Sequence, residues 1–101
     1  MKNGTGIKDH NSGMREWFLN HQLHRDNDLP AVEYKDGGKE WWVNGQRHRI
    51  GKPAVKDADG LQEWWVDDKL LSKEEVENWL KENKINLKSK EGQMAFKLRW
   101  G

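Results

Sequence analysis

The stretch "EWWVNGQRHRIGKPAV", residues 40–55, decides the fold. It opens with aromatic and β-branched residues, which favour a strand, and continues with Asn44-Gly45, a dipeptide typical of tight β-hairpin turns. His48-Arg49 follows, and then Pro53-Ala54-Val55, a short β-prone run that begins with proline, a residue tolerated at the first position of a strand. The stretch therefore predicts strand, turn and strand in succession.

Closely similar stretches lie on both sides of it. Trp17, Trp41 and Trp64 begin equivalent motifs that are 24 and 23 residues apart. The shared pattern is [SD]-G-x-x-E-W-[WF]-[VL]-[ND]-x-x-x-H-R, followed by P-A-V, and the third copy keeps the strand but lacks His-Arg. Self-similarity at a fixed period is typical of repeat architectures. We expect one domain over residues 1–101, with repeats over approximately 9–33, 34–56 and 57–71.

The expected fold class is mainly β with some helix (α+β). It is an antiparallel meander of about three hairpin repeats, followed by one C-terminal helix and a final short strand. Ser72-Lys73-Glu74-Glu75 is a capping box that predicts a helix over approximately 73–83. In the basic tail, 84–101, the segment "QMAFKLRW" alternates apolar with other residues and predicts the last strand.

Strand alternation divides the aromatic residues into two rows on opposite faces. One row contains Trp17, Trp41 and Trp64. The other contains Phe18, Trp42 and Trp65, with Glu16, Glu40 and Glu63 as neighbours on the same face. We expect the helix to cover one row and to leave the other partly open, although the pattern does not say which row is covered.

The words "EWWVNGQRHR" and "GKPAV" resemble the MORN-variant type of repeat, found in uncharacterised proteins of bacteria, phages and large DNA viruses. The resemblance covers roughly residues 9–71. It implies a sheet with one hairpin per repeat and a binding or scaffolding use without a catalytic motif. Ordinary MORN repeats are rich in Gly and Tyr, whereas here Trp-Trp and His-Arg dominate.

The recurring His-Arg pairs have two interpretations. Arginine is a good bidentate donor to a phosphate or a carboxylate, so His24, Arg25, His48 and Arg49 could contact a phosphate. Alternatively, they hold the repeats together, with arginine paired to a glutamate or a loop carbonyl and histidine capping a turn. Their loss in the third repeat fits the structural interpretation.

Composition and motifs argue against several other classes of function. The net charge is only +1, which is not a signal for coating a polyanion, and the chain has no cysteine for disulfides or thiolate metal sites. His21 and His24 form an H-x-x-H without further ligands at the right spacing, so we expect no metal and no cofactor. No nucleophile or phosphate-loop motif is present, and we expect no enzyme activity. The start, "MKNGTGIKDHNSG", has no apolar stretch, so we expect neither a signal peptide nor a membrane anchor, and a cytoplasmic location.

We therefore expect a small non-enzymatic binding protein, in the manner of a phage or viral accessory or inhibitor protein that docks on a host macromolecule, with a protein as the first choice of partner. The predicted contact residues are the second aromatic row with two arginines at its rim: Phe18, Trp42, Trp65, Arg47 and Arg49. The alternative is a nucleotide or single-stranded nucleic-acid binder that uses the His-Arg pairs and a tryptophan. Pairing of edge strands would allow a homo-oligomer.

Overall fold

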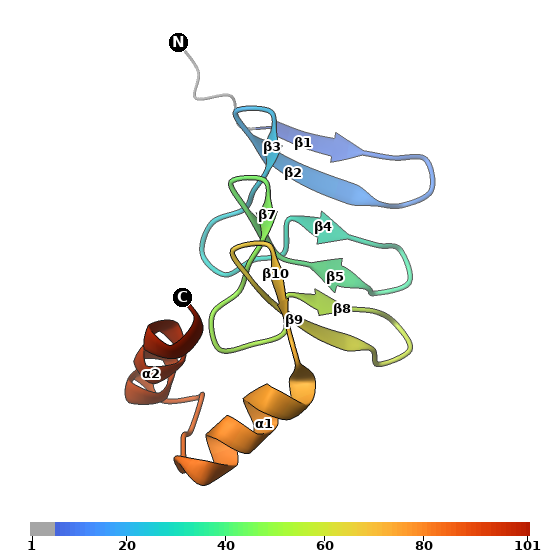
Figure 1. Ribbon diagram of the computed structural model, residues 1–101. Helices are drawn as coiled ribbons and strands as arrows, with labels where there is room; N and C mark the ends of the chain where they lie inside the picture. Colours follow the sequence, from blue (N-terminus) through green and yellow to red (C-terminus); the bar gives the residue numbers. More distant parts are fainter. Residues whose placement is uncertain (1–5) are drawn as a thin grey trace.

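The computed structural model describes residues 6–101, and it is a stack of β-hairpins that ends in two helices (Figure 1). All strand pairs are antiparallel, and the main sheet has the order β1-β2-β4-β5-β8-β9-β10. β3 pairs with β2, and β6 pairs with β7 as a separate small sheet. The strands are β1 Gly6–Asp9, β2 Arg15–Leu19, β3 Gln22–Leu23, β4 Val32–Glu33, β5 Lys39–Glu40, β6 Trp42–Val43, β7 Gln46–Arg47, β8 Val55–Lys56, β9 Gln62–Val66 and β10 Lys69–Leu71. The helices are α1 Lys73–Glu82 and α2 Lys90–Trp100. This confirms the predicted mainly β, antiparallel fold class.

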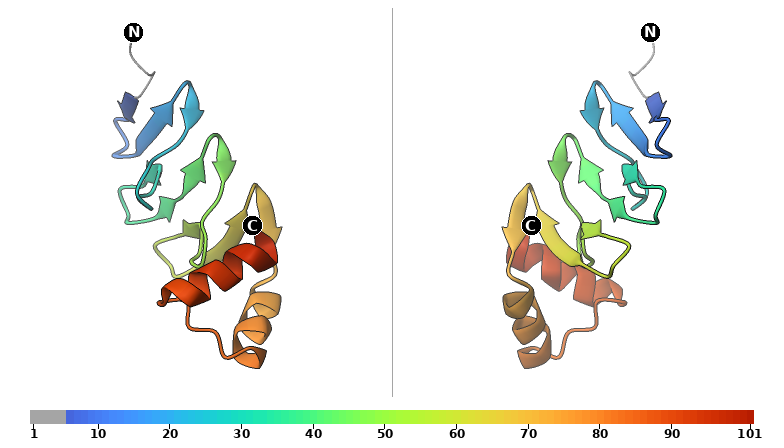
Figure 2. Two further views of the ribbon diagram at one scale, coloured as in Figure 1. Left: turned by 90° about the vertical axis from the view of Figure 1, so that its left-hand side faces the viewer. Right: turned by 90° about the vertical axis from the view of Figure 1, so that its right-hand side faces the viewer.

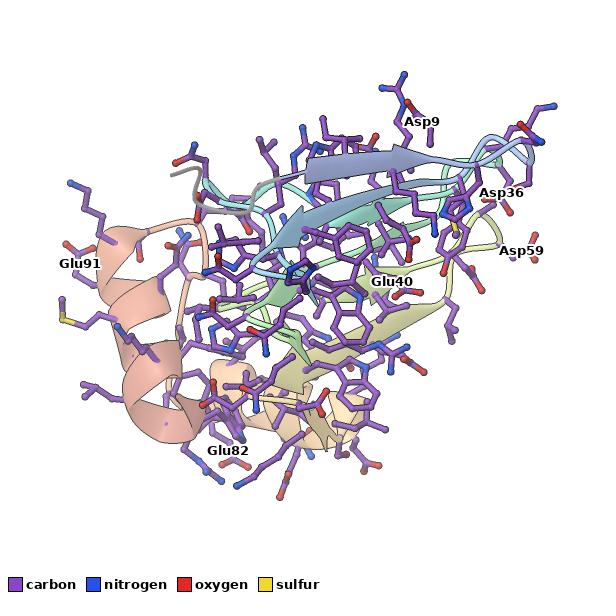
Figure 3. The ribbon with its side chains drawn as sticks, turned by 90° about the horizontal axis from the view of Figure 1, so that it is seen from above. Asp9, Asp36, Glu40, Asp59, Glu82 and Glu91 are labelled. Carbon is purple, nitrogen blue, oxygen red and sulfur yellow. The ribbon has the colours of Figure 1, made fainter. Side chains whose placement is uncertain are left out.

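Two kinds of hairpin alternate along the chain. In one kind, β1–β2, β4–β5 and β8–β9 are joined by turns at the same end of the molecule, near the labelled Asp9, Asp36 and Asp59 (Figure 3). In the other kind, β2–β3, β6–β7 and β9–β10 are joined by tight two-residue tips. The tip residues all have positive φ angles, which is the backbone conformation that Asn, Asp and Gly tolerate best: Asn20, His21, Asn44, Gly45, Asp67 and Asp68.

The predicted helix after the third hairpin is confirmed, since α1 runs from Lys73 to Glu82. The Ser72 side chain accepts a hydrogen bond from the Glu75 backbone N–H, as the capping-box pattern predicts. Val76 on this helix is completely buried, while Trp79 and Leu80 pack against the same cluster.

The predicted final strand is wrong, because residues 90–100 form α2. The alternating pattern of this segment also places Gly92, Phe96 and Trp100 on one helical face, and this face lies against the third hairpin and α1. Gly92 also lets the linker between α1 and α2 pass close to α2, since a Cβ at this position would lie 1.8 Å from the Asn86 carbonyl oxygen. Burial of one helical face therefore prevails over the alternation.

The apolar core cluster lies between the third hairpin and the two helices. Val66, Val76 and Phe96 are its fully buried members, and the Phe96 ring lies 5.7 Å from the Trp64 ring and 4.9 Å from the Trp100 ring. Because Trp64 belongs to the first aromatic row, the helices lie on the face of that row and cover it at the third hairpin. Figure 2 shows both helices at the end of the stack that is farthest from β1.

Candidate binding face

The face that the helices leave uncovered carries three cross-strand pairs, one in each tight hairpin. Side chains directly opposite in an antiparallel pair share a face and interact. The three pairs are Phe18 with Leu23, Trp42 with Arg47, and Trp65 with Leu70. We call these six residues the aromatic ladder, and each pair a rung.

Arg47 joins the second and third rungs of the aromatic ladder. Its guanidinium carbon lies 4.8 Å from the centre of the Trp42 ring and 5.0 Å from that of Trp65, so the cation contacts both aromatic rings. Its closest carboxylate contact is weak, at 3.9 Å from Nη2 to Glu40 Oε1. Its Nε is buried and has no hydrogen-bond partner within residues 6–101. The guanidinium is therefore held by rings more than by acceptors.

Half-buried glutamates fix the indoles of the aromatic ladder. Trp42 Nε1–H donates a hydrogen bond to Glu40 at 2.8 Å, and Trp65 Nε1–H donates one to Glu63 at 3.0 Å. These bonds place each glutamate on the same face as the tryptophan two residues later, as the alternation predicts. Figure 3 shows Glu40 among aromatic side chains on this face of the sheet.

Tyr34 is a second donor to Glu40, and its hydroxyl donates a hydrogen bond to that carboxylate at 2.7 Å. Burial raises the pKa of Tyr34 to about 12, and the hydrogen bond to Glu40 and the charge of that carboxylate add to the effect. The phenol therefore stays protonated and keeps its role as a donor. Leu70, in the third rung of the ladder, is 58% exposed and offers an apolar surface.

Arg49 does not lie at the rim of this row, as the sequence suggested, but is buried on the opposite face. Its guanidinium carbon lies 3.7 Å from the centre of the Trp41 ring, and the residue is 8% exposed. Nε and Nη2 donate to the two carboxylate oxygens of Asp28 at 2.8 and 3.2 Å, and Nη1 donates to the Pro53 carbonyl at 3.1 Å. The reason is that β7 ends at Arg47, so the strand alternation no longer governs Arg49.

Asp28 is a partner that sequence reasoning missed. Burial alone raises the pKa of this carboxyl, but the hydrogen bond and the charge of Arg49, helped by Lys52, outweigh it and lower the pKa below its ordinary value. No sequence signal identified Asp28, since it lies in the loop where the first repeat has an extra residue. Leu23 and Leu70 were also missed, although they occupy the place of Arg47 in the aligned motifs.

The two histidines of the His-Arg pairs connect successive hairpins. His24 Nδ1 accepts a hydrogen bond from the Asn44 N–H, and His48 Nδ1 accepts one from the Asp67 N–H. Both distances are 3.0 Å. An acceptor at Nδ1 carries no proton, so Nε2 of His24 is the donor to Asp26, at 2.7 Å. This geometry favours the interpretation in which the pairs hold neighbouring hairpins together.

Arg25 occupies the same place in the first repeat as Arg49 does in the second. Its guanidinium carbon lies 3.8 Å from the centre of the Trp17 ring. Nη1 donates to the Pro30 carbonyl at 3.2 Å and to Glu33 at 3.4 Å. The structure thus separates the predicted residues into two sets: Phe18, Trp42, Trp65 and Arg47 share the aromatic ladder, whereas His24, Arg25, His48 and Arg49 lie between hairpins.

No group of three or more His, Cys, Asp or Glu side chains that could hold a metal ion occurs within residues 6–101. Neither α1 nor α2 has the length and apolar character required to cross a membrane, in the part of the chain that the structure describes. No protein-family model, curated protein or solved structure matches the chain.

Proposed function

We propose that the protein is a non-enzymatic binding protein that docks on a partner protein through the aromatic ladder. The observation that carries the proposal is the position of Arg47 between the rings of Trp42 and Trp65, beside the exposed Leu70. Trp and Arg are the residues most enriched at the energetic centre of protein interfaces. Indoles fixed by glutamates lose little conformational entropy on binding, which favours affinity.

The charges of this face support a protein partner over a nucleic acid. Glu16, Glu40 and Glu63 accompany the ladder, and they oppose the approach of phosphates to Arg47. The nucleotide or single-strand alternative used His24, Arg25, His48 and Arg49. Arg49 is fully bonded to Asp28 and Pro53, and the Nδ1 atoms of both histidines accept backbone N–H groups, so most of this set already has partners within the chain. We therefore retain it only as an outcome of the experiment below.

The resemblance to MORN-variant repeats supports a binding role, which is the kind of role that an accessory or inhibitory protein on the surface of a host macromolecule would have. We place this activity in the cytoplasm, since a chain without cysteine needs no oxidising compartment for its fold.

The test is a set of surface variants in affinity capture from a nuclease-treated host lysate. Leu70→Glu and Arg47→Glu each change the ladder, and Leu98→Glu is the matched control, because Leu98 is an exposed leucine on α2, outside the ladder. Circular dichroism first confirms that all three variants fold. We expect a partner that wild type and Leu98→Glu retain and that both ladder variants bind at least tenfold more weakly.

An unchanged set of captured proteins in both ladder variants would contradict the proposal. A parallel titration measures tryptophan fluorescence with short oligonucleotides at two salt concentrations. Saturable quenching at low salt that disappears in Arg47→Glu would assign the ladder to single-stranded nucleic acid instead.

A further inference from the structure

The Trp-Arg stacks of the first and second repeats differ in the hydrogen-bond acceptors that contact them within residues 6–101. At Trp41-Arg49, the Asp28 carboxylate accepts two hydrogen bonds from Arg49, and the Asp28 carbonyl accepts the Trp41 Nε1–H at 3.0 Å. At Trp17-Arg25, no acceptor within residues 6–101 reaches Arg25 Nε, Arg25 Nη2 or Trp17 Nε1. The Arg25 side chain is accordingly 25% exposed, against 8% for Arg49.

The three tight hairpin tips also differ in whether their backbone N–H groups have an acceptor. In the second tip, the Asn44 N–H donates to His24 Nδ1, and the Gly45 N–H donates to the Leu23 carbonyl at 2.9 Å. In the third tip, the N–H groups of Asp67 and Asp68 donate to His48 Nδ1 and to the Arg47 carbonyl.

The first tip, Asn20-His21, has the same left-handed backbone, with φ angles of 52° and 68°. Its two N–H groups meet no acceptor in the described part of the chain. This tip belongs to β2–β3, the hairpin at the N-terminal end of the stack (Figure 1).

All of the unmatched donors of the first hairpin correspond to donors that one short segment satisfies in the second. Residues 23–28 supply the Leu23 carbonyl, the His24 imidazole, and the Asp28 carboxylate and carbonyl. A single segment of about six residues could therefore supply acceptors to all of the unmatched donors. Beside them lies a hollow of about 340 Å³ that includes Trp17, Leu19 and Leu29 in its lining.

We propose that the N-terminal end of the hairpin stack binds an extended peptide segment of another protein. A carboxylate of this segment pairs with Arg25 Nε and Nη2, and its imidazole or carbonyl acceptors receive the N–H groups of Asn20, His21 and Trp17. The bound segment reproduces the contacts that residues 23–28 make with the second hairpin, so the new interface continues one that the molecule already contains.

A second folded copy of this chain does not supply such a segment. Its residues 23–28 are bonded to its own second hairpin, and its third hairpin has Leu71-Ser72 where the earlier ones have His-Arg. α1 and α2 also cover that end of the stack. The occupant is therefore an acidic, extended segment of a different protein, which the Arg25 charge attracts.

The experiment uses the full chain, labelled with ¹⁵N, and a capped synthetic peptide with the sequence of residues 22–29, QLHRDNDL. We expect the peptide to shift the backbone amide signals of Asn20 and His21 and the indole signal of Trp17, while the other indoles remain in place. A peptide with Asp28→Asn should bind roughly tenfold more weakly, because a charge-assisted hydrogen-bond pair is lost. A peptide with His24→Phe should weaken binding less, through the loss of one neutral acceptor.

These peptide variants leave the protein unchanged, so a folding defect cannot cause the loss. On the protein side, Arg25→Gln should abolish the difference between the parent and the Asp28→Asn peptide. Leu70→Glu should bind the peptide as wild type does, which separates this site from the aromatic ladder.

Three results with the peptides would overturn the proposal. The peptide could leave the three signals unshifted at millimolar concentration, it could shift Asn44 and Gly45 instead, or the Asn variant could bind as well as the parent. A last titration replaces the peptide with inorganic phosphate at the same concentration and follows the same three signals. Equal shifts from phosphate would assign Arg25 to a free anion and not to a peptide.

Discussion

Trp41 and Trp64 occupy equivalent places in successive hairpins, yet different chemistry covers their rings. The Arg49 guanidinium lies 3.7 Å from the centre of the Trp41 ring, whereas the Phe96 ring lies 5.7 Å from that of Trp64. The first contact is polar and continues to Asp28 of the preceding repeat. The second belongs to an apolar cluster with Trp79 and Trp100. The same strand position thus either connects one hairpin to the next or closes the stack.

The two arrangements also differ in how they are stabilised. A guanidinium tolerates burial only when its donors are bonded, and Arg49 satisfies this condition with Asp28 and Pro53. Phe96 has no such requirement and contributes through the burial of apolar area and through ring contacts. We therefore expect substitutions in the apolar end to have the larger effect on stability.

Removal of the Phe96 ring should cause the largest loss. Phe96 is 0% exposed and contacts Trp64, Trp79 and Trp100, so Phe96→Ala leaves a cavity in the main apolar cluster. We expect the free energy of unfolding to fall by about 3–5 kcal/mol. Urea denaturation followed by tryptophan fluorescence measures it. Leu98→Ala on the same helix is the control, and it should change stability by less than about 0.5 kcal/mol because Leu98 is 84% exposed. Equal effects of the two substitutions would contradict the assigned packing.

Loss of the carboxylate beside Arg49 should have an intermediate effect. Asp28→Asn keeps the shape but removes the charge that faces the buried guanidinium. We expect a decrease of about 1–2 kcal/mol in the free energy of unfolding, since Asp28 itself is partly exposed and water screens the pair.

The matched comparison is Glu33→Gln beside Arg25, where a single contact of 3.4 Å joins more exposed groups. This variant should lose less than about 0.5 kcal/mol. A larger loss in Glu33→Gln than in Asp28→Asn would reverse the order that we assign to the two arginine contacts.

Acidification should remove the contribution of the Asp28 carboxylate to the free energy of unfolding. Since the folded state holds the pKa of Asp28 below its ordinary value of 3.8, the ionised carboxylate stabilises the fold at pH values above 3.8. This contribution is lost as the pH falls from 3.8 through the lowered pKa of the folded state. The difference in unfolding free energy between wild type and Asp28→Asn should stay constant near neutral pH and shrink in that acidic range. A difference that grows on acidification would show that Asp28 does not stabilise the fold by its charge.

The sequence predicted those features that depend on local patterns. The β6–β7 hairpin follows from a β-prone run joined to the next strand by Asn44-Gly45, and the start of α1 follows from the capping box at Ser72. Alternation also placed Glu40 with Trp42 and Glu63 with Trp65. These relations involve residues within a few positions of one another, so the local chain determines them.

The features that were missed depend on contacts distant in sequence. α2 was predicted as a strand because its alternating residues fit both structures, and only the cluster around Trp64 and Trp79 favours the helix. Arg49 was assigned to the wrong face because the strand ends two residues earlier, and its partner Asp28 lies 21 residues away. Which aromatic row the helices cover is likewise set by tertiary packing.

The contacts between successive tight hairpins would allow the stack to be lengthened by whole repeats. The last residue of β3 or β7 offers a carbonyl to the next tip, and the histidine that follows it offers an imidazole. A duplicate of residues 34–56 inserted after Lys56 would therefore find compatible neighbours on both sides. Each added cassette would contribute one more rung and leave the helical end untouched. The extent of partner surface within reach would then grow in fixed increments through duplication of a short stretch of gene, without any change to the apolar cluster that ends the stack.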